Sequence, residues 1–169
     1  MPDPARRRLL QLLAAGTLLP PPCWAKPPKT ENDQPGDILQ RTIPGSAEQL
    51  PVIGLNTARV FDVGTAEKVR GPVREGLRLA AQNANCVVDV SPAMGQSEQV
   101  VGDLAEELGV GDGLFVASRV MSQGKVEGVL QIQRSEQRLR RKNLDLVQVH
   151  NLVDWRTHYK TLREGKEGG

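Results

Sequence analysis

From Leu50 onward, short apolar runs alternate with longer stretches in which apolar residues recur every three or four positions. The short runs are rich in valine, as buried strands are, and the longer stretches have the period of amphipathic helices. This alternation predicts βα units around a parallel sheet. Four units are expected, with strands at residues 50–55, 86–90, 114–120 and 144–150 and helices at residues 66–81, 97–108, 125–141 and 156–164.

The first of these helices has the least regular sequence. Val69, Val73, Leu77 and Ala80 fall roughly on one face, which we expect to contact the sheet. Pro72 lies inside the same stretch and removes one backbone hydrogen bond, so this helix is the least strongly predicted of the four.

Gly109–Gly113 contains three alternate glycines, a composition also seen in phosphate-binding loops. Such a loop needs a strand before it and a helix N-terminus after it, so that backbone amides point at the phosphate. Here a helix precedes the glycines and a strand follows. We therefore interpret the segment as a turn in which Gly109 ends the helix.

Residues 1–25 have the pattern of a secretory signal: the arginines at 6–8, the uncharged stretch 9–22 and a small-residue end. The apolar part is too short to span a bilayer, so a removed peptide is expected rather than an anchor. The arginines resemble a twin-arginine signal, which implies export, in bacteria to the periplasm. The alternatives are a lipoprotein anchored through Cys23 or a frayed N-terminus that is merely basic and apolar.

Residues 26–42 are rich in proline and polar side chains, and they are interpreted as a flexible linker ahead of a domain at residues 43–169. Removal of the signal would take away three arginines and one aspartate, leaving a charge of about zero. Because the remaining charges of both signs are mixed, we expect no nucleic-acid partner and no membrane contact. With Cys86 the only remaining thiol, an intramolecular disulfide is excluded.

Four βα units are half of an eight-stranded TIM barrel, which usually takes about 250 residues. The fold class expected is therefore α/β, a partial (β/α)8 barrel with a parallel sheet that does not close within this chain.

Four segments carry a resemblance to a known family. Asp89–Glu98 resembles the aldo/keto reductase signature that begins with Asp and ends in Tyr-Gly-x-Ser-Glu. Residues 50–57, 114–120 and 144–155 resemble the first, third and fourth strand motifs of the same family, in the same order. The resemblance covers residues 43–165, and it implies a barrel enzyme that reduces carbonyl groups with NADP(H).

The family mechanism implies a tetrad of Asp, Tyr, Lys and His. A hydride from the cofactor goes to the carbonyl carbon, and the Tyr hydroxyl, its pKa lowered by the Lys, gives a proton to the oxygen. Asp89 and His150 match two positions, whereas Met94 stands at the Tyr position and Arg119 at the Lys position. Tyr159 lies in the last helix and is a poor substitute.

The resemblance also places Asn56, Thr57 and Asp89 beside the cofactor. The family has glycine at the Asn56 position, and it takes its main nicotinamide and adenosine-phosphate contacts from the second half of the barrel. Binding of NADP(H) is therefore doubtful. A small carbonyl compound is the substrate expected of an active enzyme.

The residues by themselves place Asp89, Arg119 and His150 near the carboxyl ends of successive parallel strands, where barrel enzymes carry their chemistry. Simpler interpretations remain open: Asp89 as a strand-end residue bonded to a loop, His150 as a packed histidine, and Met94 as apolar filler. Asp89, His150 and His158 lack a metal-ligand spacing, so no metal site is expected.

Three functions remain open. The first is an exported aldo/keto reductase homologue, truncated, with weak or no activity as a pseudoenzyme. The second is a non-catalytic half-barrel module that assembles as a homodimer or with a complementary half-barrel. The third is a fragment that does not fold alone, because an open sheet would leave Val88, Val116 and Val149 partly uncovered.

Overall fold

The computed structural model describes residues 38–82 and 86–168. The predicted signal peptide, and the predicted linker as far as residue 37, lie outside the described residues. Within the described part, no helix has both the length and the apolar character needed to cross a membrane.

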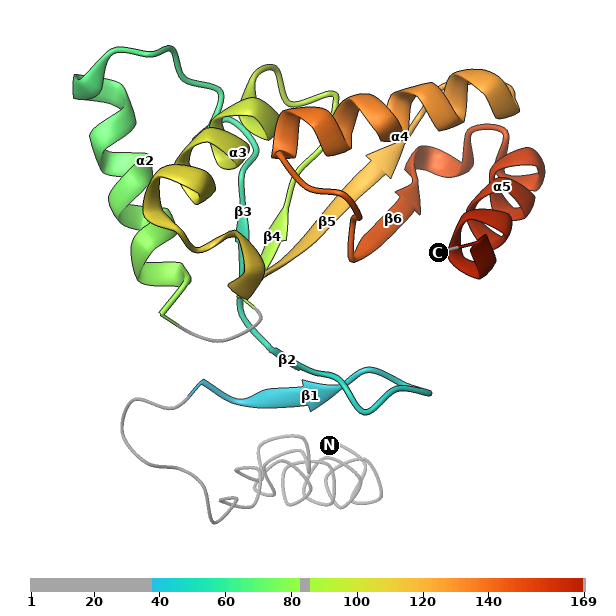
Figure 1. Ribbon diagram of the computed structural model, residues 1–169, viewed down its shortest axis with the longest axis horizontal. Helices are drawn as coiled ribbons and strands as arrows, with labels where there is room; N and C mark the ends of the chain where they lie inside the picture. The colour runs from blue at the N-terminus through green and yellow to red at the C-terminus, as the bar shows by residue number, and fades with distance from the viewer. Residues whose placement is uncertain (1–37, 83–85, 169) are drawn as a thin grey trace, which may run out of the picture. The chain divides into compact units, whose positions relative to one another are not determined.

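Strands and helices alternate from the third strand to the end of the described chain (Figure 1). In chain order the elements are β1 (Gln40–Thr42), β2 (Gln49–Pro51), β3 (Gly54–Asn56), α2 (Glu67–Ala80), β4 (Cys86–Asp89), α3 (Ser97–Leu108), β5 (Leu114–Val120), α4 (Lys125–Leu139), β6 (Leu146–Val149) and α5 (Trp155–Gly168), with short 3-10 turns at Gly111–Gly113 and His150–Leu152.

The main sheet has four strands in the order β3-β4-β5-β6, and each neighbouring pair is parallel. Each strand is followed by a helix before the next strand, which is the connection that parallel neighbours require. The expected α/β fold, a partial barrel of four βα units, is confirmed. A separate antiparallel hairpin of β1 and β2 precedes it.

The helices pack against one face of this sheet. Val88 and Val116 are opposite each other in the register of β4 and β5, and they are 0% and 1% exposed. Around them, apolar side chains of α2, α3 and α4 complete one buried cluster; the members from the helices are Val73, Leu77, Val100, Val101, Leu104, Ala105 and Leu139. Since side chains alternate along a strand, the intervening residues point to the other face.

This burial corrects one expectation. Val88 and Val116 were expected to be partly uncovered, but they are fully buried because they belong to the helix-facing side of the sheet. Val149 is half-buried, as expected of a residue on the outermost strand. The side chains that face away from the helices are their sequence neighbours, such as Val87 and Ala117.

The strand expected at residues 50–55 is divided in two. Its first part pairs antiparallel with β1, where Gln40 is opposite Pro51, and its second part pairs parallel with β4 from Gly54. Val52 and Ile53 join the two parts and are 50% and 65% exposed. An apolar run does not reveal its pairing partners, so the sequence pattern merged two strands into one. The predicted linker also ends earlier than expected, because β1 begins at Gln40.

Two helix ends depend on left-handed backbone conformations. Gly109 takes φ 65° directly after α3, which confirms that it ends this helix. Arg140 takes φ 54° after α4, so that helix ends at Leu139 and not at Arg141 as expected. In α2, Pro72 is accommodated without a break, but Val69 is 43% exposed and lies outside the buried face predicted for it.

Asp103 on α3 holds three helices together. Its carboxylate accepts hydrogen bonds from Arg70 of α2 at 3.1 Å and from Arg140, which follows α4, at 2.8 Å. Gln99 donates a further bond at 2.7 Å. Partial burial raises the pKa of Asp103, but the hydrogen bonds from Arg140, Gln99 and Arg70 outweigh it and hold this pKa below its ordinary value.

We expect Asp103→Asn to lower the free energy of unfolding by about 1 kcal/mol at pH 7, since a partly exposed charge network is lost. A depressed pKa in the folded state stabilises the protein above the unfolded value of about 4, and this contribution disappears as the pH falls through the folded value. In urea unfolding, the difference in the free energy of unfolding between wild type and variant should therefore be smaller at pH 3 than at pH 7.

Glu164→Gln is the matched control, because the ion pair of Glu164 with Lys125 is exposed on both sides. We expect its effect to stay within a few tenths of a kcal/mol. A difference for Asp103→Asn that is equal at both pH values would contradict the electrostatic explanation.

Candidate functional site

The carboxyl ends of β3, β4 and β5 bring three polar side chains to one edge of the sheet. Asn56 is opposite Asp89 in the register, and Arg119 lies two residues beyond the position opposite Asp89 on β5. All three belong to the face that points away from the helices. The parallel direction of the strands is the reason that residues far apart in the sequence meet here.

Asp89 and Arg119 form an ion pair. The guanidinium Nη2 of Arg119 donates to Oδ2 of Asp89 at 2.8 Å, and Nη1 donates to the carbonyl of Val90 at 3.4 Å. Their side chains are 24% and 21% exposed, so the pair is only partly shielded from water. The amide of Asn56 makes a longer contact of 3.5 Å with the same carboxylate oxygen.

Thr57 connects this pair to Met94. Thr57 is fully buried, and its hydroxyl donates to the backbone carbonyl of Asp89 at 2.8 Å. The sulfur of Met94, which is half-buried, lies 3.7 Å from the same hydroxyl oxygen. Met94 therefore lies beside the strand end that carries Asp89, with its thioether next to the hydroxyl of Thr57.

The loop that carries Met94 is fixed by a contact that sequence reasoning missed. The carboxylate of Asp62, from the loop after β3, accepts a hydrogen bond from the backbone N–H of Gln96 at 3.0 Å. Gly95 has φ 57°, and a Cβ there would overlap with the Asp62 carboxylate. Nothing in the spacing of Asp62 and Gly95 along the chain indicates that the two loops meet.

Glu98 is a second residue whose role the sequence did not reveal. It is 1% exposed, accepts a hydrogen bond from the Ser118 hydroxyl at 2.9 Å and pairs with Arg138 at 3.3 Å. These bonds connect α3 to β5 and α4 on the helix-facing side. Glu98 thus has a structural role in this chain, away from the strand-end cluster.

His150 begins the short turn after β6 and is half-buried. Among the described residues, no hydrogen bond or ion pair joins it to Asp89 or Arg119. Tyr159 is 61% exposed on α5 and is not part of the strand-end cluster. No group of three or more His, Cys, Asp or Glu side chains in the described ranges is arranged to hold a metal ion.

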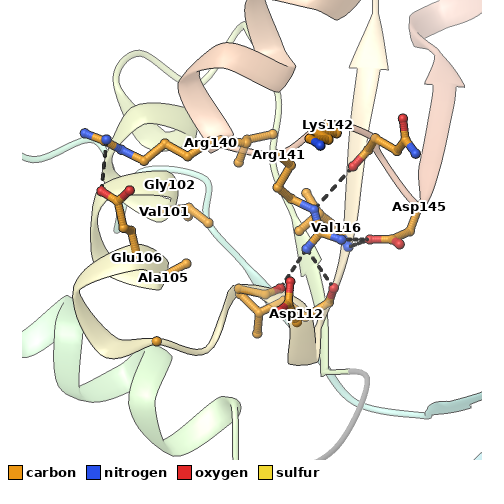
Figure 2. Close-up of a pocket in the computed structure, with 15 residues that line it drawn as sticks. Val101, Gly102, Ala105, Glu106, Asp112, Val116, Arg140, Arg141, Lys142 and Asp145 are labelled. Atoms are coloured by element: carbon orange, nitrogen blue, oxygen red, sulfur yellow. Dashed lines mark hydrogen bonds and ion pairs between the residues drawn. The ribbon is translucent and has the colours of Figure 1, made fainter.

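A cavity of about 670 Å³ lies at the opposite end of the strands, between α3, α4 and the start of β5 and β6 (Figure 2). Arg141 points into this region and donates to the carbonyls of Gly111 and Leu114, at 2.9 and 3.0 Å, and to Asp145 at 3.0 Å. Asp145 in turn accepts from the N–H of Val116 at 2.7 Å. The donors of Arg141 are thus used to join loops, and the cavity is separate from the strand-end cluster.

Comparison with solved structures identifies the fold. Neither a family model nor a curated protein matches the chain. A protein of Pseudomonas aeruginosa described as an aldo-keto reductase matches 78% of this chain and 56% of its own, with a TM-score of 0.61 and 20% identity. An aldo-keto reductase of Klebsiella pneumoniae in complex with NADPH matches 69% and 41%, with a TM-score of 0.58 and 22% identity.

A third structure, an aldo-keto reductase of Bombyx mori in complex with NADP, matches 77% of this chain and 47% of its own, with a TM-score of 0.58 and 17% identity. At these identities the comparison establishes the fold: the described chain has the architecture of part of an aldo/keto reductase barrel. The chain spans about half the length of the solved structures it matches.

We expect the Asp89–Arg119 ion pair to contribute about 1 kcal/mol to the free energy of unfolding, because its two side chains are neither fully exposed nor fully buried. A double-mutant cycle with Asp89→Asn, Arg119→Gln and the combined variant, measured by urea unfolding, gives this coupling free energy directly. The same cycle on the exposed pair Arg163–Glu167 should give about 0.3 to 0.5 kcal/mol. A coupling free energy near zero for Asp89 and Arg119 would contradict the ion pair that the structure indicates.

Proposed function

We propose that this chain is related to the aldo/keto reductases and carries an oxidoreductase site of that type, with weak or no carbonyl reductase activity of its own. The single observation that carries the proposal is the strand-end cluster, in which Asp89 pairs with Arg119 and the thioether of Met94 lies beside Thr57. The cluster keeps the location of the family site, whereas two of the four groups that perform the chemistry are different.

Proton transfer is the step that these residues do not support. A thioether has no proton to donate, and a guanidinium stays charged at every pH relevant to a protein. Arg119 can donate hydrogen bonds to a carbonyl oxygen and so polarise it, but it cannot complete the reduction by giving up a proton. A positioned general acid contributes about 10²- to 10⁴-fold in rate.

The cofactor implied by the family is NADP(H), which supplies the hydride when bound. The described residues offer it few contacts. The hydroxyl of Thr57 is buried and used by the Asp89 carbonyl, and the guanidinium of Arg119 is paired. Asn56 has an exposed side chain, and its carbonyl oxygen accepts the N–H of Ala58 at 2.8 Å. We infer that the affinity of this chain for NADP(H) is low.

The substrate that fits this proposal is a small carbonyl compound. The second part of the proposal is that the protein is exported from the cytoplasm. The second statement rests on residues 1–25, whose arginines and uncharged stretch favour export. Fractionation of cells that produce the tagged full chain tests it, because retention of an unprocessed chain in the cytoplasm would contradict export.

We expect Met94→Tyr combined with Arg119→Lys to raise the rate of NADPH-dependent carbonyl reduction about 10²- to 10⁴-fold over the wild type. The double change restores a hydroxyl that can give up a proton and a compact ammonium beside it. The measurement is NADPH consumption with a series of small aldehydes at saturating cofactor, with calorimetry to establish that the cofactor binds.

Met94→Phe combined with Arg119→Lys is the matched control, since it supplies the ring without the hydroxyl and should stay at the wild-type rate. Wild-type turnover that the tyrosine does not increase would overturn the proposal. So would a folded double variant that binds NADPH and stays inactive.

A further inference from the structure

The two outermost strands of the parallel sheet are β3 and β6. Within residues 38–82 and 86–168, β3 is bonded only to β4 in this sheet, and β6 only to β5. The outer side of each strand therefore presents backbone N–H and C=O groups to which no described strand is bonded. Such edges attract another strand unless they are covered.

The helix beside the β3 edge has an apolar side that faces away from its neighbour. Arg70 and Arg74 of α2 form ion pairs with carboxylates of α3, which fixes the side of α2 that faces α3. The positions on the opposite side are Val69, Pro72, Gly76 and Leu79, which are three or four residues apart. Val69 and Leu79 are 43% and 49% exposed.

The helix beside the β6 edge has the same property. Glu164 of α5 pairs with Lys125 of α4, which fixes the side of α5 that faces α4. On the side away from α4, Trp155 and Tyr159 are one turn apart and are 45% and 61% exposed, and Leu152 just before the helix is 71% exposed. Figure 1 shows α2 and α5 at the two opposite ends of the sheet.

We propose that a second copy of this chain covers both edges. In this dimer β3 of each copy pairs with β6 of the other. The two β3–β6 pairs are related by a two-fold axis that runs in the direction of the strands. All four strands run in one direction, so both new pairs are parallel, as in the rest of the sheet. Two copies supply eight strands, the number that closes a (β/α)8 barrel, and the structures that this chain matches are about twice its matched length.

The same dimer brings the outward side of α2 against the outward side of the partner's α5. Because the helices of the two copies run in the same direction, Val69, near the start of α2, is the residue that faces Trp155 and Tyr159, near the start of α5. It also encloses the second face of the sheet, where Leu146 is 42% exposed and Val87 is half-buried. These side chains become the interior of the barrel, which is filled by layers of apolar side chains in such folds. The proposal does not depend on reductase activity, so it can fail while the proposed function stands.

The test is the molar mass of the full chain by sedimentation velocity over a range of concentrations. We expect a dimer for the wild type. Val69→Glu and Tyr159→Lys should each weaken it about 30-fold or more, because each places a charge in an apolar contact. Both residues are exposed in the single chain, so neither change should unfold it, which circular dichroism checks.

Two further variants make the test specific. Leu130→Glu, on the exposed side of the inner helix α4, is the matched control and should leave the dimer intact. The combination of Val69→Glu with Tyr159→Lys in one chain should restore dimerisation, because each new glutamate then meets a lysine of the partner. A wild type that stays monomeric at all concentrations, single variants without effect, or a combined variant no better than the single ones would overturn the proposal.

Discussion

The packing of α2, α3 and α4 against one face of the parallel sheet is the interaction on which the rest of the structure depends. Val88 and Val116 form the centre of this contact, where almost no surface remains exposed. Side chains alternate along a strand. Burial of these two positions therefore fixes the face of the sheet to which each remaining residue of β4 and β5 points. Asp89 and Arg119 therefore point to the opposite face, away from the helices.

The chemistry of the strand-end cluster follows from this arrangement. Parallel strands bring their carboxyl ends together, which explains how an aspartate and an arginine thirty positions apart form an ion pair. The position of Met94 depends on something else, the contact between the loops after β3 and β4 through Asp62. The place where Asp89 and Arg119 meet is thus set by the fold, whereas the chemistry open to the cluster depends on single side chains such as Met94.

Much of the architecture could be predicted because the hydrophobic pattern has the period of the elements. The third strand was predicted with the bounds that β5 has, and Gly109 was predicted to end α3. The errors arose where pattern alone does not identify a partner. Residues 50–55 contribute to two sheets. Val69 fits the helical spacing of the buried residues, but it lies on the side of α2 where the described chain supplies no neighbour.

The sequence by itself determined the alternation of strands and helices and indicated the candidate residues Asp89, Met94, Arg119 and His150, since each is a local property of the chain. The tertiary structure decided which candidates meet. It pairs Asp89 with Arg119, leaves His150 without a bond to either, and adds Asp62 and Glu98, which no motif indicated as partners. The physical reason is that a hydrogen bond requires proximity in space, which comes from strand register and loop contacts between segments distant in the chain.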